Sequence, residues 1–180
     1  MLTHDLRNRF HPLSIGAHWL TLILLLAAYA LIELRGLAPK GGELRDAMKT
    51  WHYAVGLTVF AIAGLRLVLL PFTRTPPIVP EPTSWQRGAA RAMHVALYAF
   101  LIAMPLLGWL ALSAKGTPVA FFGWELPALI GRDRPLARNL KDIHEVVGTL
   151  GYFLIGTHAL AALFHHHVMR DNTLRRMSPW

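Results

Sequence analysis

Histidine is the residue type whose placement points most directly to chemistry in this chain. The 180 residues contain ten histidines and no cysteine. His18, His52, His94, His144 and His158 lie within or at the edge of apolar stretches, where ionisable groups are costly and therefore candidates for function. A lone histidine there can also serve only as a hydrogen bond between helices. Without cysteine, a metal cofactor must be held by His, Met or carboxylates, and c-type haem attachment is excluded.

The spacing of the histidines predicts pairs. His144 and His158 are separated by about 21 Å of helical rise and project from nearly the same helix face. In an up-down-up-down bundle, His18 lies at the depth of His158, and His52 lies at the depth of His144. Each pair offers two imidazoles to one iron ion, and without cysteine a haem held in this way is of the b type. His94 lies as deep in its own stretch as His18 does, so depth alone does not say which of them faces His158.

The elements that position these histidines are apolar and long. No Asp, Glu, Lys or Arg occurs in residues 10–32, 92–114 or 146–169, and residues 50–72 contain only Arg66. Each run exceeds the roughly 20 residues that span a bilayer core. Continuous runs of this kind exclude the alternating ten-residue segments of a β-barrel. We therefore predict an all-α integral membrane protein, a four-helix transmembrane bundle enclosing two b-type haems. It forms one domain over residues 1–180, with helices near 12–33, 50–72, 90–114 and 138–168.

Composition and charge agree with a membrane protein. Apolar residues make up 54% of the chain and charged residues 16%, against about 25% charged in soluble domains. The net charge of +8 suits a lipid surface, and no nucleic-acid-binding motif accompanies it. Lys and Arg divide evenly between the two membrane faces, so the positive-inside rule does not determine the orientation.

Short motifs occur in a fixed order along the whole chain. They are Ser-Ile-Gly-Ala-His-Trp at 14–19, Trp-His-Tyr-Ala-Val-Gly at 51–56, Arg-Leu at 66–67, Pro-Pro at 76–77, His-Val-Ala-Leu-Tyr at 94–98, Leu-Lys-Asp-Ile-His-Glu at 140–145 and Asp-Asn-Thr-Leu-Arg-Arg-Met at 171–177. Together they resemble the prokaryotic cytochrome b561 family from end to end. More distantly, the chain is similar to the cytochrome b subunits of formate dehydrogenase and nickel hydrogenase complexes.

The resemblance implies a set of haem ligands and a location. It implies two b haems held by His18 with His158 and by His52 with His144. His94 then becomes a residue that lies beside the ligands or in a quinone site. The resemblance also implies the bacterial inner membrane, with both termini cytoplasmic, electron exchange with ubiquinone, and superoxide as the electron donor.

Cationic side chains complete the expected site. Two haems bring four propionates, and Lys49 and Arg66 are candidates by position to neutralise them. Other cations lie in the loops at the His52 and His144 end, where they would attract a small anion if they converge. With Lys49, this group comprises Arg35, Lys40, Arg45, Arg132, Arg134, Arg138 and Lys141.

Three functions compete at this point. The first is an oxidoreductase that oxidises superoxide and reduces quinone. The second is a cytochrome b anchor subunit that exchanges electrons with a partner dehydrogenase or hydrogenase. The third is a histidine-lined transporter without haem.

Overall fold

Four long helices form the part of the protein that the structure describes. A computed structural model describes residues 9–179. The helices are α2 (Pro12–Leu34), α3 (Glu43–Leu69), α4 (Ser84–Lys115) and α5 (Arg134–Phe164). Together with the short turns η2 (Arg35–Leu37), η3 (Leu70–Phe72) and η4 (His165–Met169), they make four segments long and apolar enough to cross a membrane. The predicted all-α membrane bundle is therefore confirmed.

Helices α3, α4 and α5 begin before their apolar runs do, and polar caps start α4 and α5. Gly42 caps α3, with Glu43 in its first turn. A capping box joins Thr83 and Gln86 at the start of α4. Asp133 caps α5, and its side chain accepts a hydrogen bond from the Leu136 amide at 3.0 Å. Such caps satisfy the unpaired amides of a first helical turn, so these helices extend beyond the hydrocarbon-spanning residues.

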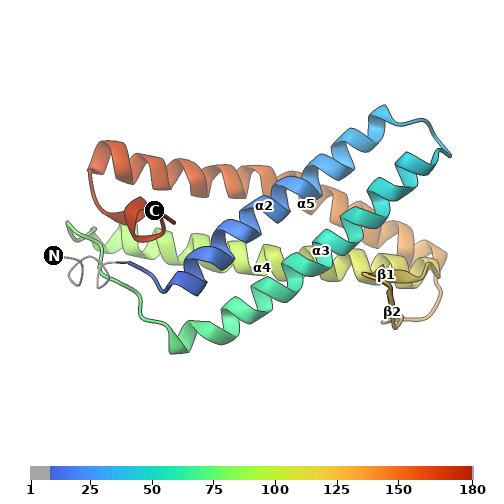
Figure 1. Ribbon diagram of the computed structural model, residues 1–180, viewed down its shortest axis with the longest axis horizontal. Helices are drawn as coiled ribbons and strands as arrows, with labels where there is room; N and C mark the ends of the chain where they lie inside the picture. The colour runs from blue at the N-terminus through green and yellow to red at the C-terminus, as the bar shows by residue number, and fades with distance from the viewer. Residues whose placement is uncertain (1–8, 180) are drawn as a thin grey trace.

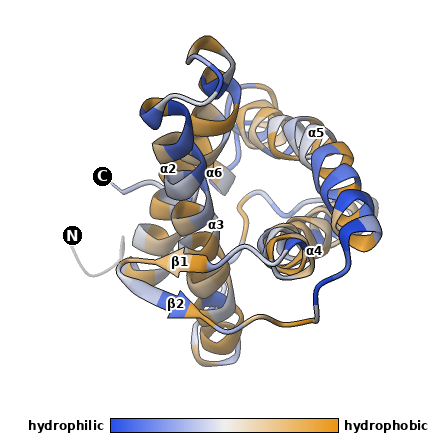
Figure 2. Ribbon diagram, turned by 90° about the vertical axis from the view of Figure 1, so that its right-hand side faces the viewer, coloured by the Kyte–Doolittle hydropathy of each residue, from blue (hydrophilic) through white to orange (hydrophobic). Residues whose placement is uncertain are grey.

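The helices are arranged as two antiparallel hairpins, α2 with α3 and α4 with α5 (Figure 1). Helix α3 also packs against α4. One cluster of apolar residues fills this contact with Val59, Ala63, Phe100 and Leu101. Seen along the bundle, apolar turns are visible on α2, α3 and α4, whereas the near end of α5 is hydrophilic (Figure 2). Many large apolar side chains are exposed, as expected where lipid replaces water.

A small β-hairpin interrupts the helical architecture between α4 and α5. Strands β1 (Val119–Phe121) and β2 (Trp124–Leu126) pair antiparallel, with Phe121 opposite Trp124. The two loop residues, Phe122 and Gly123, have φ of 46° and 87°, which fits the twist of a tight hairpin. Val119 is buried against Leu57 and Leu112, so the hairpin covers the end of α4 and the middle of α3.

The C-terminal segment returns to the start of α2. After the π-helical turn η4, helix α6 (Thr173–Arg176) brings the chain back over the first membrane-spanning helix. The Phe10 amide donates to the Arg176 carbonyl at 3.1 Å, and the Trp19 indole N–H donates to the Met177 carbonyl at 2.8 Å. Both ends of the described chain therefore lie at one end of the bundle (Figure 1).

Candidate functional site

The first histidine pair joins α2 to α5. The rings of His18 and His158 have their centroids 6.2 Å apart, with an angle of 63° between their planes. His18 follows the Pro12 start of α2 by less than two turns, and His158 lies near the end of α5. The structure thus brings together, across two hairpins, residues that are far apart in sequence.

The second pair joins α3 to α5 at the other end of the bundle. The centroids of His52 and His144 are also 6.2 Å apart, with an angle of 82° between the planes. Helix α5 therefore supplies one ring to each pair, as the spacing of His144 and His158 predicts.

Backbone carbonyls orient the rings of the second pair. Nδ1 of His52 lies 2.9 Å from the Ala28 carbonyl oxygen, and Nδ1 of His144 lies 3.0 Å from the Met104 carbonyl oxygen. A carbonyl only accepts, so both Nδ1 atoms donate N–H groups in these contacts. Each Nε2 then keeps its lone pair, which is the arrangement of a metal-ligating histidine held by a neighbouring acceptor.

The ring separations fit an iron ion between each pair. Metal–imidazole bonds of about 2.0 Å to two opposed nitrogens place the ring centroids about 6 Å apart. Glycines flank the pairs, and a Cβ added at Gly16, Gly56 or Gly156 would meet no heavy atom within 4 Å. A flat macrocycle can therefore approach the backbone of three helices beside the histidines. The donor set and its surroundings fit two b-type haems.

His94 lies beside the first pair. Its ring centroid is 5.7 Å from that of His158, with an angle of 76° between the planes. Its Nδ1 lies 2.6 Å from the Ala90 carbonyl oxygen in the preceding turn of α4. The structure thus gathers His18, His94 and His158 at one level. The ring of His158 has two histidine neighbours there, His18 and His94.

The two candidate propionate partners differ in their surroundings. Arg66 is half-buried, with Nη1 3.5 Å from the Thr21 hydroxyl and its guanidinium 5.5 Å from the centre of the Tyr98 ring. It lies within electrostatic reach of His18 and His158. Lys49, in contrast, pairs with Asp46 at 2.6 Å on the surface of α3. Arg66 is therefore placed at the first histidine pair, and Lys49 already has a carboxylate partner.

The histidine run at the end of α5 has a local role that its sequence did not reveal. Nδ1 of His165 is 2.5 Å from Oδ2 of Asp171. Burial acts to raise the pKa of Asp171, but hydrogen bonds from His165 and the Thr173 amide outweigh burial and hold this pKa below its ordinary value. Only the return of the chain after η4 reveals this pair. Across residues 9–179, no three His, Asp or Glu side chains converge as ligands of a non-haem metal ion.

Comparisons with known proteins agree with this geometry. The sequence profile of the prokaryotic cytochrome b561 family matches residues 9–180. Cytochrome b561 homolog 1 of Escherichia coli is 40% identical over 172 residues, covering 96% of this chain and 98% of the relative. A probable superoxide oxidase of Yersinia pestis is 38% identical over 174 residues, covering 97% and 98%. Cytochrome b561 homolog 2 of Escherichia coli is 29% identical over 172 residues, covering 94% and 91%.

Proposed function

Since the chain belongs to the prokaryotic cytochrome b561 family, we propose that it is a di-haem superoxide:ubiquinone oxidoreductase of the bacterial inner membrane. The family membership itself makes it a multi-pass membrane protein of electron transfer. The observation that carries the finer proposal is the presence of two histidine pairs, each with ring centroids 6.2 Å apart, at the two ends of one bundle.

In this proposal His18 and His158 hold one haem, and His52 and His144 hold the other. Arg66 lies within electrostatic reach of both rings of the first pair and balances propionate charge there. When bound, each haem supplies an iron ion that gains or loses one electron. Because two histidines would hold each haem iron, the substrates would exchange electrons with the haems without binding iron.

The proposed reaction balances over two superoxide anions. Each superoxide loses one electron and leaves as dioxygen, and one ubiquinone gains two electrons and two protons to become ubiquinol. The name of the Yersinia pestis relative, a probable superoxide oxidase, supports superoxide as the donor. With both termini cytoplasmic, the His52 and His144 end faces the periplasm and receives it.

Cations at the periplasmic end support an anionic donor. Two of the eight, Lys49 and Lys141, pair with Asp46 and Glu145 at 2.6 Å. The other six form no ion pair within residues 9–179, and their charges remain available to a small anion. They are Arg35, Lys40, Arg45, Arg132, Arg134 and Arg138.

Haem counting in ligand variants tests the cofactor part of this proposal. The protein purified in mild detergent should contain two b haems per chain by pyridine haemochrome, and His158→Ala should contain one. His94→Ala is the matched control, because its ring lies at least as close to His158 as that of His18 does. We expect His94→Ala to keep both haems and His18→Ala to lose one.

Three results would overturn the ligand assignment. They are no haem in the wild-type protein, two haems in His158→Ala, or a haem lost from His94→Ala but kept in His18→Ala. Stopped-flow mixing then tests the two substrates. The oxidised protein is mixed with superoxide, and the reduced protein is mixed with a soluble quinone. Stoichiometric co-purification of a dehydrogenase, with no reaction with superoxide, would instead favour the anchor-subunit function.

A further inference from the structure

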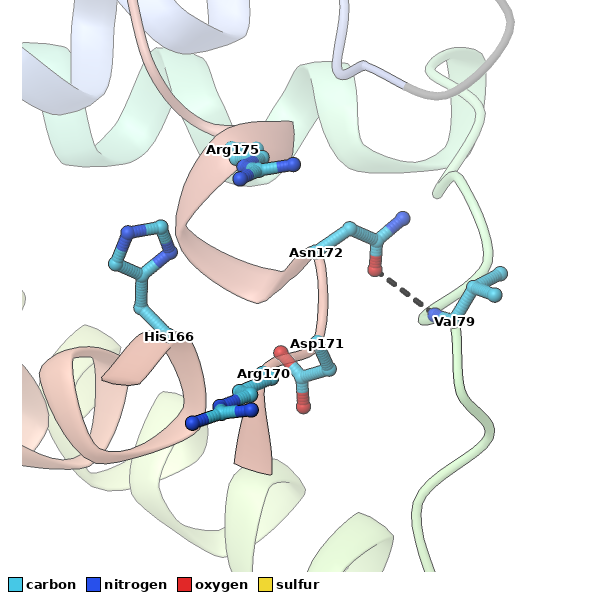
Figure 3. A pocket seen from close by; sticks show the side chains of 6 residues that line it. All are labelled: Val79, His166, Arg170, Asp171, Asn172 and Arg175. Atoms are coloured by element: carbon cyan, nitrogen blue, oxygen red, sulfur yellow. Dashed lines mark hydrogen bonds between the residues drawn. The ribbon is translucent and has the colours of Figure 1, made fainter. Parts of the chain in front are cut away.

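A polar pocket lies just beyond the last membrane-spanning segment. It has a volume of about 310 Å³ and is lined by Val79, His166, Arg170, Asp171, Asn172 and Arg175 (Figure 3). This is close to the lower limit of roughly 300 Å³ for ligand pockets. The apolar segment ends at Met169, immediately before Arg170, so the pocket lies at the depth of lipid headgroups.

Hydrogen bonds to the α3–α4 connector hold one wall of the pocket. The Asn172 side chain accepts from the Val79 amide at 2.8 Å and donates to the Pro77 carbonyl at 3.3 Å. The Asn172 amide also donates to the Val79 carbonyl at 3.1 Å. Arg170 has a φ of 55°, a left-handed conformation that turns the chain from η4 into this wall. The α3–α4 connector and the segment after η4, which are far apart in sequence, are therefore hydrogen-bonded to each other beside the pocket.

The pocket has an excess of positive charge. Arg170 and Arg175 are permanently charged and form no ion pair within residues 9–179. The one carboxylate, Asp171, is satisfied inside the chain, because its two oxygens accept from His165 at 2.5 Å and from the Thr173 amide at 2.8 Å. Asp171 is thus engaged with neighbours other than the two arginines.

One residue that lines the pocket, His166, also has an unpartnered buried atom. Nδ1 of His166 is buried and has no hydrogen-bond partner within residues 9–179, and leaving such an atom unpaired is costly. A ligand oxygen would satisfy it if the ring is protonated at Nδ1. In the close view, His166 comes from η4, Arg170 directly follows η4, and Arg175 comes from α6 (Figure 3).

We propose that this pocket binds a phosphate group, with Arg170 and Arg175 contacting its oxygens and His166 donating from Nδ1. Guanidinium groups match the geometry of phosphate and bind it through paired hydrogen bonds. The depth of the pocket makes the phosphate of an anionic phospholipid headgroup the expected source, as basic pockets at the ends of membrane helices bind such headgroups. Free phosphate shares the same chemistry and is distinguished by experiment. The proposal does not depend on the redox function.

Native mass spectrometry of the delipidated holoprotein tests this site. The protein is titrated separately with phosphatidylglycerol, with phosphatidylcholine and with inorganic phosphate. The test variant is Arg170→Gln with Arg175→Gln, and the matched control is Arg74→Gln with Arg91→Gln. Arg74 lies on the connector that follows η3 and Arg91 on the first turns of α4. The control pair removes the same charge from the same membrane face and lies outside the pocket.

We expect phosphatidylglycerol to bind the wild-type protein and the control alike, and the test variant at least tenfold more weakly. Arg170→Lys with Arg175→Lys should recover part of the lost affinity, and an unchanged haem spectrum and thermal midpoint would exclude misfolding. Binding of inorganic phosphate with the same arginine dependence, and without lipid binding, would support the site with free phosphate as its source. Equal binding by the test and control variants, to lipid and to phosphate, would overturn the proposal.

Discussion

Replacing Gly151 with alanine should weaken the packing that holds α5 against α2 and α4. Gly151 is buried on α5, and a Cβ built on it would lie 2.6 Å from Cε2 of Phe100. The Cζ of Phe100 and the hydroxyl of Tyr29 would lie closer still. Ordinary van der Waals contact begins at 3.4 Å, so two aromatic side chains on two helices must move.

The expected loss of stability has two parts. Overpacking a close contact typically destabilises by about 1–3 kcal/mol. Moving Tyr29 also threatens its 2.7 Å hydrogen bond to the Gly148 carbonyl, and such a bond contributes about 1 kcal/mol. The free energy of unfolding should therefore fall by about 2–4 kcal/mol. At roughly 2–4 °C per kcal/mol, the thermal midpoint should fall by roughly 4–16 °C.

Thermal unfolding in detergent, followed by circular dichroism and haem absorbance, measures this loss. Gly88→Ala is the matched control, because a Cβ there meets nothing within 4 Å, and alanine is the better helix former. Its midpoint should stay equal or rise. Adding Tyr29→Phe to Gly151→Ala should restore part of the midpoint, since it removes one of the crowded atoms. A wild-type midpoint in Gly151→Ala would refute the close approach of these three helices.

Two other perturbations act on charge. Asp171→Asn should flatten the acid dependence of stability. The pKa of Asp171 is lower in the folded state than the ordinary 3.8, so its stabilising contribution is present above that value and is lost as the pH falls through the folded-state pKa. Between roughly pH 5 and pH 3, the wild-type thermal midpoint should fall further than that of Asp171→Asn, and equal falls would contradict the pair with His165. Arg134→Gln with Arg138→Gln should slow superoxide-driven haem reduction severalfold at low ionic strength, with the deficit shrinking in high salt. A rate equal to that of Arg74→Gln with Arg91→Gln would contradict electrostatic attraction.

The amino-acid sequence by itself determined the membrane class and the depth of each histidine. Both follow from local properties. The length of an uncharged run decides whether a segment spans the bilayer, and the helical rise converts the spacing of His144 and His158 into a separation along α5. Three of the predicted spans begin later than helices α3, α4 and α5 do. For α4 and α5 the reason is also local, because polar caps at Thr83 and Asp133 start these helices ahead of their apolar runs.

Only the tertiary structure decided what surrounds each histidine. Ala28 and Met104 place carbonyl oxygens on the rings of His52 and His144, and no periodicity within one helix predicts an acceptor on another. The same applies to His165, whose partner Asp171 depends on how the chain turns after η4. Depth along the membrane is a property of each helix alone, whereas rotation and crossing angle are set by packing between helices. For that reason the sequence alone shows which histidines lie at the same depth in the membrane. The contacts that each histidine makes at that depth follow only from the fold.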